Sequence, residues 1–154
     1  MKARFNPFVV APDAYKAVLA LENYVREGSG LSHRLLHLIK LRASILNGCA
    51  HCVDMHVKES RKDGLSEQWI NLVSVWREAG IYNEAERAVL GWTDALTLLS
   101  QTGAPDADFE PLRAHFTEQE IANITVAIGV INVWNRIAVG MRLQHPVDVN
   151  AKAA

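Results

Sequence analysis

The sequence predicts an all-α fold in which residues 1–154 form a single domain of six to seven helices with no sheet. Apolar residues recur every three or four positions through most of the chain, which is the spacing of one face of a helix. Residues with capping preferences precede these runs and glycines follow them, as is typical of helix starts and stops. No segment alternates apolar and polar residues for long enough to predict a strand.

Composition excludes several classes of protein. Hydrophobic residues make up 49% and charged residues 21% of the chain, which is ordinary for a globular protein with one core. The net charge of -1 argues against a nucleic-acid partner or an anionic membrane surface, because both require clustered basic residues. The apolar stretch at 121–135 is shorter than the roughly 20 residues that cross a bilayer, so no membrane span is predicted. Residues 1–10 lack the apolar segment of a signal peptide, and we expect a cytoplasmic protein.

The predicted helices begin and end at residues with known capping preferences. A proline–aspartate pair at 12–13 opens the first helix, and Asn47-Gly48 ends the second because both residues tolerate the left-handed conformation of a helix C-cap. Residues 1–11 are expected to be irregular, and residues 146–154 are expected to form a C-terminal tail. In order, the predicted helices cover about residues 12–28, 32–46, 49–62, 66–79, 83–100, 109–115 and 117–142.

The last predicted helix differs from the others because its apolar residues occupy every side. It opens with a capping box, in which Glu120 follows Thr117 by three residues. A helix that is apolar all round is buried all round. We therefore expect it to be the central helix and also to pack against another subunit.

The two cysteines, Cys49 and Cys52, lie where the third predicted helix begins. In a chain without a secretory signal, such a pair indicates a redox or metal site in a reducing compartment. The unpaired N–H groups and the dipole at a helix start favour the reactive thiolate. His56 follows Cys52 by four residues on the same helix face, where an imidazole can accept the thiol proton. The helix start favours Cys49 as the attacking thiol, whereas His56 favours Cys52.

His37 is the second candidate for proton transfer, after His56. It lies twelve residues before Cys49, on the preceding helix. If the third helix folds back along the second, a rise of about 1.5 Å per residue brings His37 within about one turn of His56. This geometry allows a relay from His37 through water to His56 and Cys52.

Two other interpretations of these residues stay open. Cys49, Cys52, His56 and His37 are the ligand types of a tetrahedral zinc site, so a non-catalytic zinc-binding protein is an alternative, although the spacing matches neither a zinc finger nor a ribbon. In the second interpretation, the two cysteines are small buried side chains that pack in the core and carry no chemistry.

Three sequence blocks resemble a known family. The run LIKLRASILNGCAHCVDMHVKESRKDG at 38–64 is similar to the core signature of the alkylhydroperoxidase AhpD-like family, part of the wider carboxymuconolactone decarboxylase superfamily. The runs WREAGIYNEAERAVLGWTDALTLL at 76–99 and ITVAIGVINVWNRIAVGM at 124–141 resemble its later blocks. The resemblance implies an AhpD-like helical bundle that assembles into homotrimers or homohexamers. It marks the run Trp134-Asn135-Arg136 for a buried hydrogen bond or a subunit contact rather than for catalysis.

The resemblance also implies an oxidoreductase of antioxidant defence that reduces organic hydroperoxides without a cofactor. A dithiol donor, such as a dihydrolipoyl or thioredoxin-like protein, would regenerate it. Carried over by position, Cys52 attacks the peroxide, Cys49 resolves the sulfenic acid into a disulfide, and His56 relays protons.

One position departs from the family pattern. The family's catalytic glutamate falls on His37, which carries no fixed negative charge near neutral pH. A disulfide carrier with little peroxidase activity is therefore the alternative function. Decarboxylases of the superfamily lack the cysteine pair, so the sequence does not predict a decarboxylase.

Overall fold

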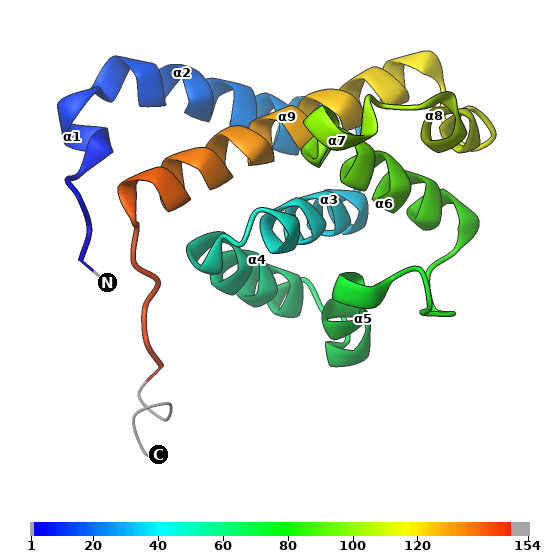
Figure 1. Ribbon diagram of the computed structural model, residues 1–154, viewed down its shortest axis with the longest axis horizontal. Helices are drawn as coiled ribbons and strands as arrows, with labels where there is room; N and C mark the ends of the chain where they lie inside the picture. Colours follow the sequence, from blue (N-terminus) through cyan, green and yellow to red (C-terminus); the bar gives the residue numbers. More distant parts are fainter. Residues whose placement is uncertain (1, 149–154) are drawn as a thin grey trace.

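The computed structural model describes residues 2–148, and these residues form helices joined by short turns (Figure 1). In chain order the elements are α1 (Pro7–Val10), α2 (Pro12–Asn23), the π-helical turn η1 (Tyr24–Gly28), α3 (His33–Leu46), α4 (Ala50–Lys62), α5 (Glu67–Leu72), the 3-10 turn η2 (Val73–Val75), α6 (Glu84–Thr97), α7 (Leu99–Thr102), α8 (Asp106–Arg113) and α9 (Glu118–Met141). No strand occurs within residues 2–148, which confirms the all-α prediction.

The described residues contain nine α-helices, more than the six to seven predicted. The two additional helices, α1 and α7, are single turns that are too short to show an apolar period. The prediction that residues 1–11 are irregular is wrong for α1. The side chain of Asn6 accepts a hydrogen bond from the Phe8 N–H, and Pro7 occupies the first helical position, where its missing N–H costs nothing. Of the predicted tail, residues 149–154 lie outside the described part of the chain.

The fourth predicted helix ends earlier than expected, at Leu72 rather than near Gly80. The chain continues through η2 into turns, where the guanidinium of Arg87 donates to the carbonyl oxygens of Trp76 and Ala79, at 3.1 Å each. A side chain from α6 therefore satisfies two carbonyl groups of these turns.

The centre of the bundle is α3, which packs against α4, α6 and α9 (Figure 1). Every residue of α3 from 36 to 44 is buried. The two buried charges that join α3 to α6 are paired, because the guanidinium of Arg42 makes two hydrogen bonds to the Asp94 carboxylate. Such pairing offsets the cost of removing both charges from water.

The long helix α9 packs against α2, α3, α4, α6 and α8, so it is a core helix, but α3 and not α9 is central, and the prediction that α9 is buried on every side is wrong within one chain. By length and composition alone it would also cross a membrane. Its buried amides explain it instead as a core helix, because Asn123, Asn132 and Asn135 each hydrogen-bond to another part of the bundle. Val133 and Val139 are 41% and 49% exposed, so part of its apolar surface faces outward. Contact with another subunit there stays a prediction.

The two ends of the described chain meet at the C-terminal end of α9. The backbone N–H of Arg4 donates to the Met141 carbonyl at 3.1 Å, and its guanidinium donates to the Gly140 carbonyl at 2.7 Å. The segments before α1 and after α9 accordingly run down the same side of the molecule in Figure 1.

Candidate redox site

The turn between α3 and α4 places the first cysteine. The N–H of Cys49 donates to the Ser44 carbonyl at 2.9 Å, and the N–H of Gly48 donates to the Ile45 carbonyl at 3.1 Å. These two bonds form a Schellman motif, which requires a left-handed residue, and Gly48 has a φ of 62°. The predicted stop at Asn47-Gly48 is confirmed.

Buried amides hold this turn against α9. The side-chain amide of Asn47 donates to the side-chain oxygens of Asn132 and Asn135, at 3.0 and 2.9 Å. Asn135 donates in turn to the hydroxyl of Ser44 at 3.0 Å and is 1% exposed. The buried hydrogen-bonding role expected for Asn135 is therefore confirmed, and the start of α4 has a fixed position.

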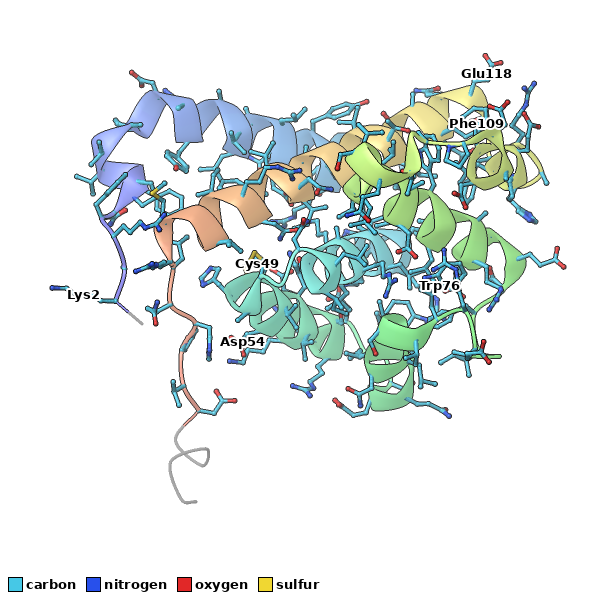
Figure 2. All side chains as sticks on the ribbon, in the orientation of Figure 1. Lys2, Cys49, Asp54, Trp76, Phe109 and Glu118 are labelled. Atoms are coloured by element: carbon cyan, nitrogen blue, oxygen red, sulfur yellow. A yellow bond between two sulfur atoms is a disulfide. The ribbon has the colours of Figure 1, made fainter. Side chains whose placement is uncertain are left out.

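Cys49 and Cys52 form a disulfide across the first turn of α4, with Cα atoms 5.3 Å apart. Cys49 is the N-cap of the helix, and its sulfur accepts a hydrogen bond from the Cys52 N–H at 3.3 Å. Figure 2 shows Cys49 where α4 begins, beside α9. Both residues are buried, with 1% and 2% of their surface exposed. Of the two, Cys52 lines a cavity of about 560 Å³.

The walls of this cavity differ in character. Apolar side chains line it from α1, α2, α3, α4, α9 and the segment after α9, whereas most of the polar side chains come from α3 and α4. The apolar lining includes Phe8, Leu19, Leu36, Met55, Trp134, Ala138 and Leu143, and the polar lining includes Glu22, His37, Lys40, His56, Glu59 and Asp63. A small apolar molecule with one polar end fits such a space.

His56 lines the cavity one turn beyond Cys52 and is 3% exposed. Its Nδ1 lies 2.8 Å from Oε2 of Glu59. Since an ionised carboxylate only accepts hydrogen bonds, Nδ1 carries the hydrogen and Nε2 presents a lone pair. Nε2 is buried and has no hydrogen-bond partner within residues 2–148. The imidazole is therefore arranged to accept a proton.

Burial sets the protonation of this pair. Desolvation lowers the pKa of His56 below its usual value, and the hydrogen bond and charge of Glu59 oppose that effect only in part. The same hydrogen bond holds the pKa of Glu59 below its usual value. At neutral pH His56 is thus a neutral base beside an ionised carboxylate.

His37 lines the same cavity from α3, but its hydrogen bond is to Asp63 and not to His56. Its Nε2 lies 2.8 Å from Oδ2 of Asp63, and its buried Nδ1 has no partner among the described residues. This hydrogen bond holds the pKa of Asp63 below its usual value. A relay from His37 to His56 stays a prediction.

The four residues proposed as zinc ligands do not come together. His37 and His56 bind separate carboxylates, and the two sulfurs are bonded to each other. Within residues 2–148 no group of three or more histidine, cysteine or acidic side chains has the geometry to hold a metal ion. The geometry of these residues thus gives no support to the zinc alternative.

Sequence reasoning missed several polar residues of the cavity, among them Glu22, Lys40 and Glu59. The spacing could have identified Glu59, since it follows His56 by three residues on one helix face. Lys40, which follows His37 by three residues, had the same signal. Lys40 forms an ion pair with Glu22, which also accepts a hydrogen bond from the Trp134 indole at 3.2 Å. Glu22 had no signal, because its partners come from α3 and α9.

The model of the carboxymuconolactone decarboxylase family matches residues 12–95, which include both cysteines, His37 and His56. This chain belongs to the carboxymuconolactone decarboxylase family. The matched region runs from α2 to α6 and covers more than half of the chain.

Several members of this family and solved structures are similar to the chain. The uncharacterised protein YdfG of Bacillus subtilis is 34% identical over 141 residues, covering 92% of this chain and 95% of that protein. The crystal structure of ATU0492 from Agrobacterium tumefaciens is 69% identical with a TM-score of 0.93, covering 96% of this chain and 100% of that one. That protein is of unknown function, with a suggested identity as antioxidant defence protein AhpD.

More distant structures share the fold with other descriptions. An uncharacterised peroxidase-related protein of Ralstonia eutropha with an alkylhydroperoxidase AhpD core is 25% identical with a TM-score of 0.78, covering 90% of this chain and 74% of that one. The debrominase Bmp8 is 20% identical with the same TM-score, covering 92% of this chain and 75% of that one, and this likeness shows the fold alone. The chain is thus an AhpD-like member of its family.

Proposed function

We propose that the protein is a thiol-dependent peroxidase that reduces alkyl hydroperoxides in antioxidant defence, through a dithiol–disulfide cycle of Cys49 and Cys52. One observation carries this proposal. Cys52, and not Cys49, borders the cavity, and His56 borders it one helical turn away with an unpartnered ring nitrogen. This arrangement offers a nucleophile and a base to a small molecule inside the cavity.

The oxidative step transfers one oxygen to sulfur. Nε2 of His56 takes the proton of the Cys52 thiol, and the thiolate attacks the terminal oxygen of the hydroperoxide. The S–O bond forms as the O–O bond breaks, so sulfur is oxidised to sulfenic acid and the peroxide is reduced. The departing alkoxide takes the proton from His56 and leaves as an alcohol.

Two further steps close the cycle. The Cys49 thiol attacks the sulfenic sulfur, which forms the disulfide and releases water. A dithiol donor, such as a dihydrolipoyl or thioredoxin-like protein, then reduces the disulfide and is itself oxidised. We propose that this cycle runs in the cytoplasm, in a homotrimer or homohexamer.

Glu59 can replace the carboxylate that this chain lacks at position 37. The family places its glutamate where this chain has His37, and here Glu59 supplies a carboxylate to His56 from the same helix. The carboxylate fixes the tautomer in which Nε2 accepts the proton, and it stabilises the imidazolium that forms.

A disulfide carrier is the second candidate function. It is favoured by the bond from His37 to Asp63, which leaves no carboxylate or imidazole from α3 in contact with His56. A carrier would exchange its disulfide with a dithiol protein and react slowly with peroxide.

A single-turnover experiment separates the two functions. The reduced protein is mixed with one equivalent of tert-butyl hydroperoxide, and mass spectrometry follows the Cys49–Cys52 disulfide. A peroxidase forms the disulfide rapidly, Cys49→Ser accumulates a sulfenic acid on Cys52, and Cys52→Ser does not consume the peroxide. Equal peroxide consumption by wild type and Cys52→Ser would contradict the proposal, whereas slow oxidation with rapid dihydrolipoamide exchange would identify a carrier.

A further inference from the structure

Lys40 is a buried cation in the wall of the candidate site. It lies on α3, is 7% exposed and lines the same cavity as Cys52 and His56. The other basic side chains of the wall, Arg26 and Lys62, are exposed at its rim. A lysine in this position requires a reason, because burying an ammonium is costly unless it is paired.

The pairing of Lys40 leaves donors available. Its Nζ donates to one oxygen of Glu22, whose other oxygen accepts from Trp134 at 3.2 Å. An ammonium carries three N–H donors, and this is the one hydrogen bond that Nζ makes within residues 2–148. Glu22 and Trp134 therefore hold the ammonium in place while two of its N–H groups stay available to a ligand.

The neighbours of Lys40 are nearly all acceptors. His37 Nδ1 and His56 Nε2 are buried in the same wall with no hydrogen-bond partner in the described part of the chain, and Glu59 and Asp63 are carboxylates. The charge of Lys40 reaches this group, since it lowers the pKa of both His56 and Glu59. A hydroperoxide offers one O–H donor and two acceptor oxygens, so it matches a wall with free imidazole acceptors and one buried donor.

We propose that Lys40 is a further catalytic residue, whose ammonium donates a hydrogen bond to the alkoxide oxygen that leaves when the O–O bond breaks. This inference rests on the proposed peroxidase function. Negative charge develops on that oxygen as Cys52 attacks, and a preorganised donor in a water-poor site stabilises it. Lys40 keeps its protons throughout, because the proton of the product alcohol comes from His56. Glu22 and Trp134 are positioning residues.

The test compares Glu22→Gln/Lys40→Met with the wild-type protein. Removing Lys40 alone would leave the Glu22 carboxylate buried and unpaired, which destabilises a fold, whereas removing both charges avoids this cost. Each reduced protein is mixed with tert-butyl hydroperoxide or with peracetic acid, and formation of the disulfide is timed. The first peroxide releases a strongly basic alkoxide that depends on a hydrogen-bond donor, and the second releases acetate, which does not.

We expect the double variant to react about a hundredfold more slowly than the wild type with tert-butyl hydroperoxide, and to lose much less with peracetic acid. The ratio of the two rates within each variant cancels any change in the access or ionisation of Cys52. Equal slowing with both peroxides, or no slowing, overturns the role of Lys40 while the peroxidase function stands. A wild-type protein that neither peroxide oxidises overturns the peroxidase function, and with it the role of Lys40.

Discussion

The imidazole of His56 and the carboxylate of Glu59 are joined by a hydrogen bond of 2.8 Å, three residues apart on the face of α4 that borders the cavity. The imidazole is buried, whereas the carboxylate side chain is 50% exposed. The pair therefore links the interior of the site to solvent. It also determines how the reactivity and the stability of the protein depend on pH.

Replacing His56 by Gln should slow the oxidation of Cys52 by tert-butyl hydroperoxide by about a hundredfold or more, because the thiol loses its general base. Single-turnover kinetics of disulfide formation measure the change. His115→Gln is the control, since His115 lies near Glu84 of α6 and outside the cavity that holds Cys52. A rate for His56→Gln within threefold of wild type, on the order of 0.7 kcal/mol, would remove His56 from the mechanism.

Replacing Glu59 by Gln should slow the alkylation of Cys52 by iodoacetamide at pH 6 by about tenfold. The carboxylate raises the pKa of His56 against the effect of burial, so its loss disfavours the imidazolium–thiolate pair. Glu67→Gln is the matched control, because Glu67 pairs with Arg61 on the surface. In the wild type we expect alkylation at pH 6 to exceed that of a free thiol, and a thiol titration midpoint near about 8.5 would contradict this.

The stability of the oxidised protein should fall as the pH drops below about 6.5. The pKa of His56 is lower in the folded chain than in the unfolded chain, so the unfolded chain binds more protons below that pH. The loss continues to the folded pKa of His56, with a slope of at most about 1.4 kcal/mol per pH unit. The lowered pKa of Glu59 adds a second loss only below its ordinary pKa of 4.5. Urea unfolding between pH 7.5 and 5 measures the first loss, and a His56→Gln variant with an unchanged slope would refute its assignment.

Substituting Gly48 by Ala should destabilise the protein by about 1 kcal/mol or more, because φ at this position is 62°. No atom lies within 4 Å of an added Cβ, so the cost is conformational and not steric. Gly129→Ala is the contrasting control, since its site within α9 is equally open and lacks a positive φ. That change should stabilise the helix by up to about 1 kcal/mol. Thermal unfolding of both variants decides whether the two shifts have opposite signs.

Substituting Asn135 by Ala should cost about 1–3 kcal/mol, because it removes buried hydrogen bonds to Asn47 and Ser44. Asn23→Ala, at the exposed end of α2, should change the free energy of unfolding by less than about 0.5 kcal/mol. Urea unfolding measures both. A loss at Asn135 no larger than at Asn23 would mean that the amide network does not hold the turn before α4.

The sequence predicted most of the parts of the site that lie along one helix, although Glu59 of α4 was missed. The stop at Gly48, the disulfide across the first turn and the placing of His56 all depend on local chain geometry, which cap residues and spacing report directly. Glu22 belongs to the same site through contacts with α3 and α9, and no local pattern reports such a contact. The direction of the His37 ring was hidden for the same reason, since Asp63, its partner, lies at the far end of α4.

The element boundaries show the same division. The helix starts at Thr117 and the stop at Gly48 were predicted, because capping chemistry resides in adjacent residues. The turns that follow α5 are held by the guanidinium of Arg87, which comes from a later helix. The apolar spacing of residues 66–79 did not reveal where the helix ends, because a helix and the looser turns that replace it bury similar side chains.

The hydrogen bonds of Arg4 to the end of α9 join the segment before α1 to the segment after α9, and Phe8 and Leu143 next to this junction line the cavity that Cys52 borders. An affinity tag or fusion partner that displaces either segment would alter the apolar lining of this cavity. Reactivity measured on tagged protein would then report the tag as well as the enzyme. Tag-free material is the appropriate starting point for kinetic work.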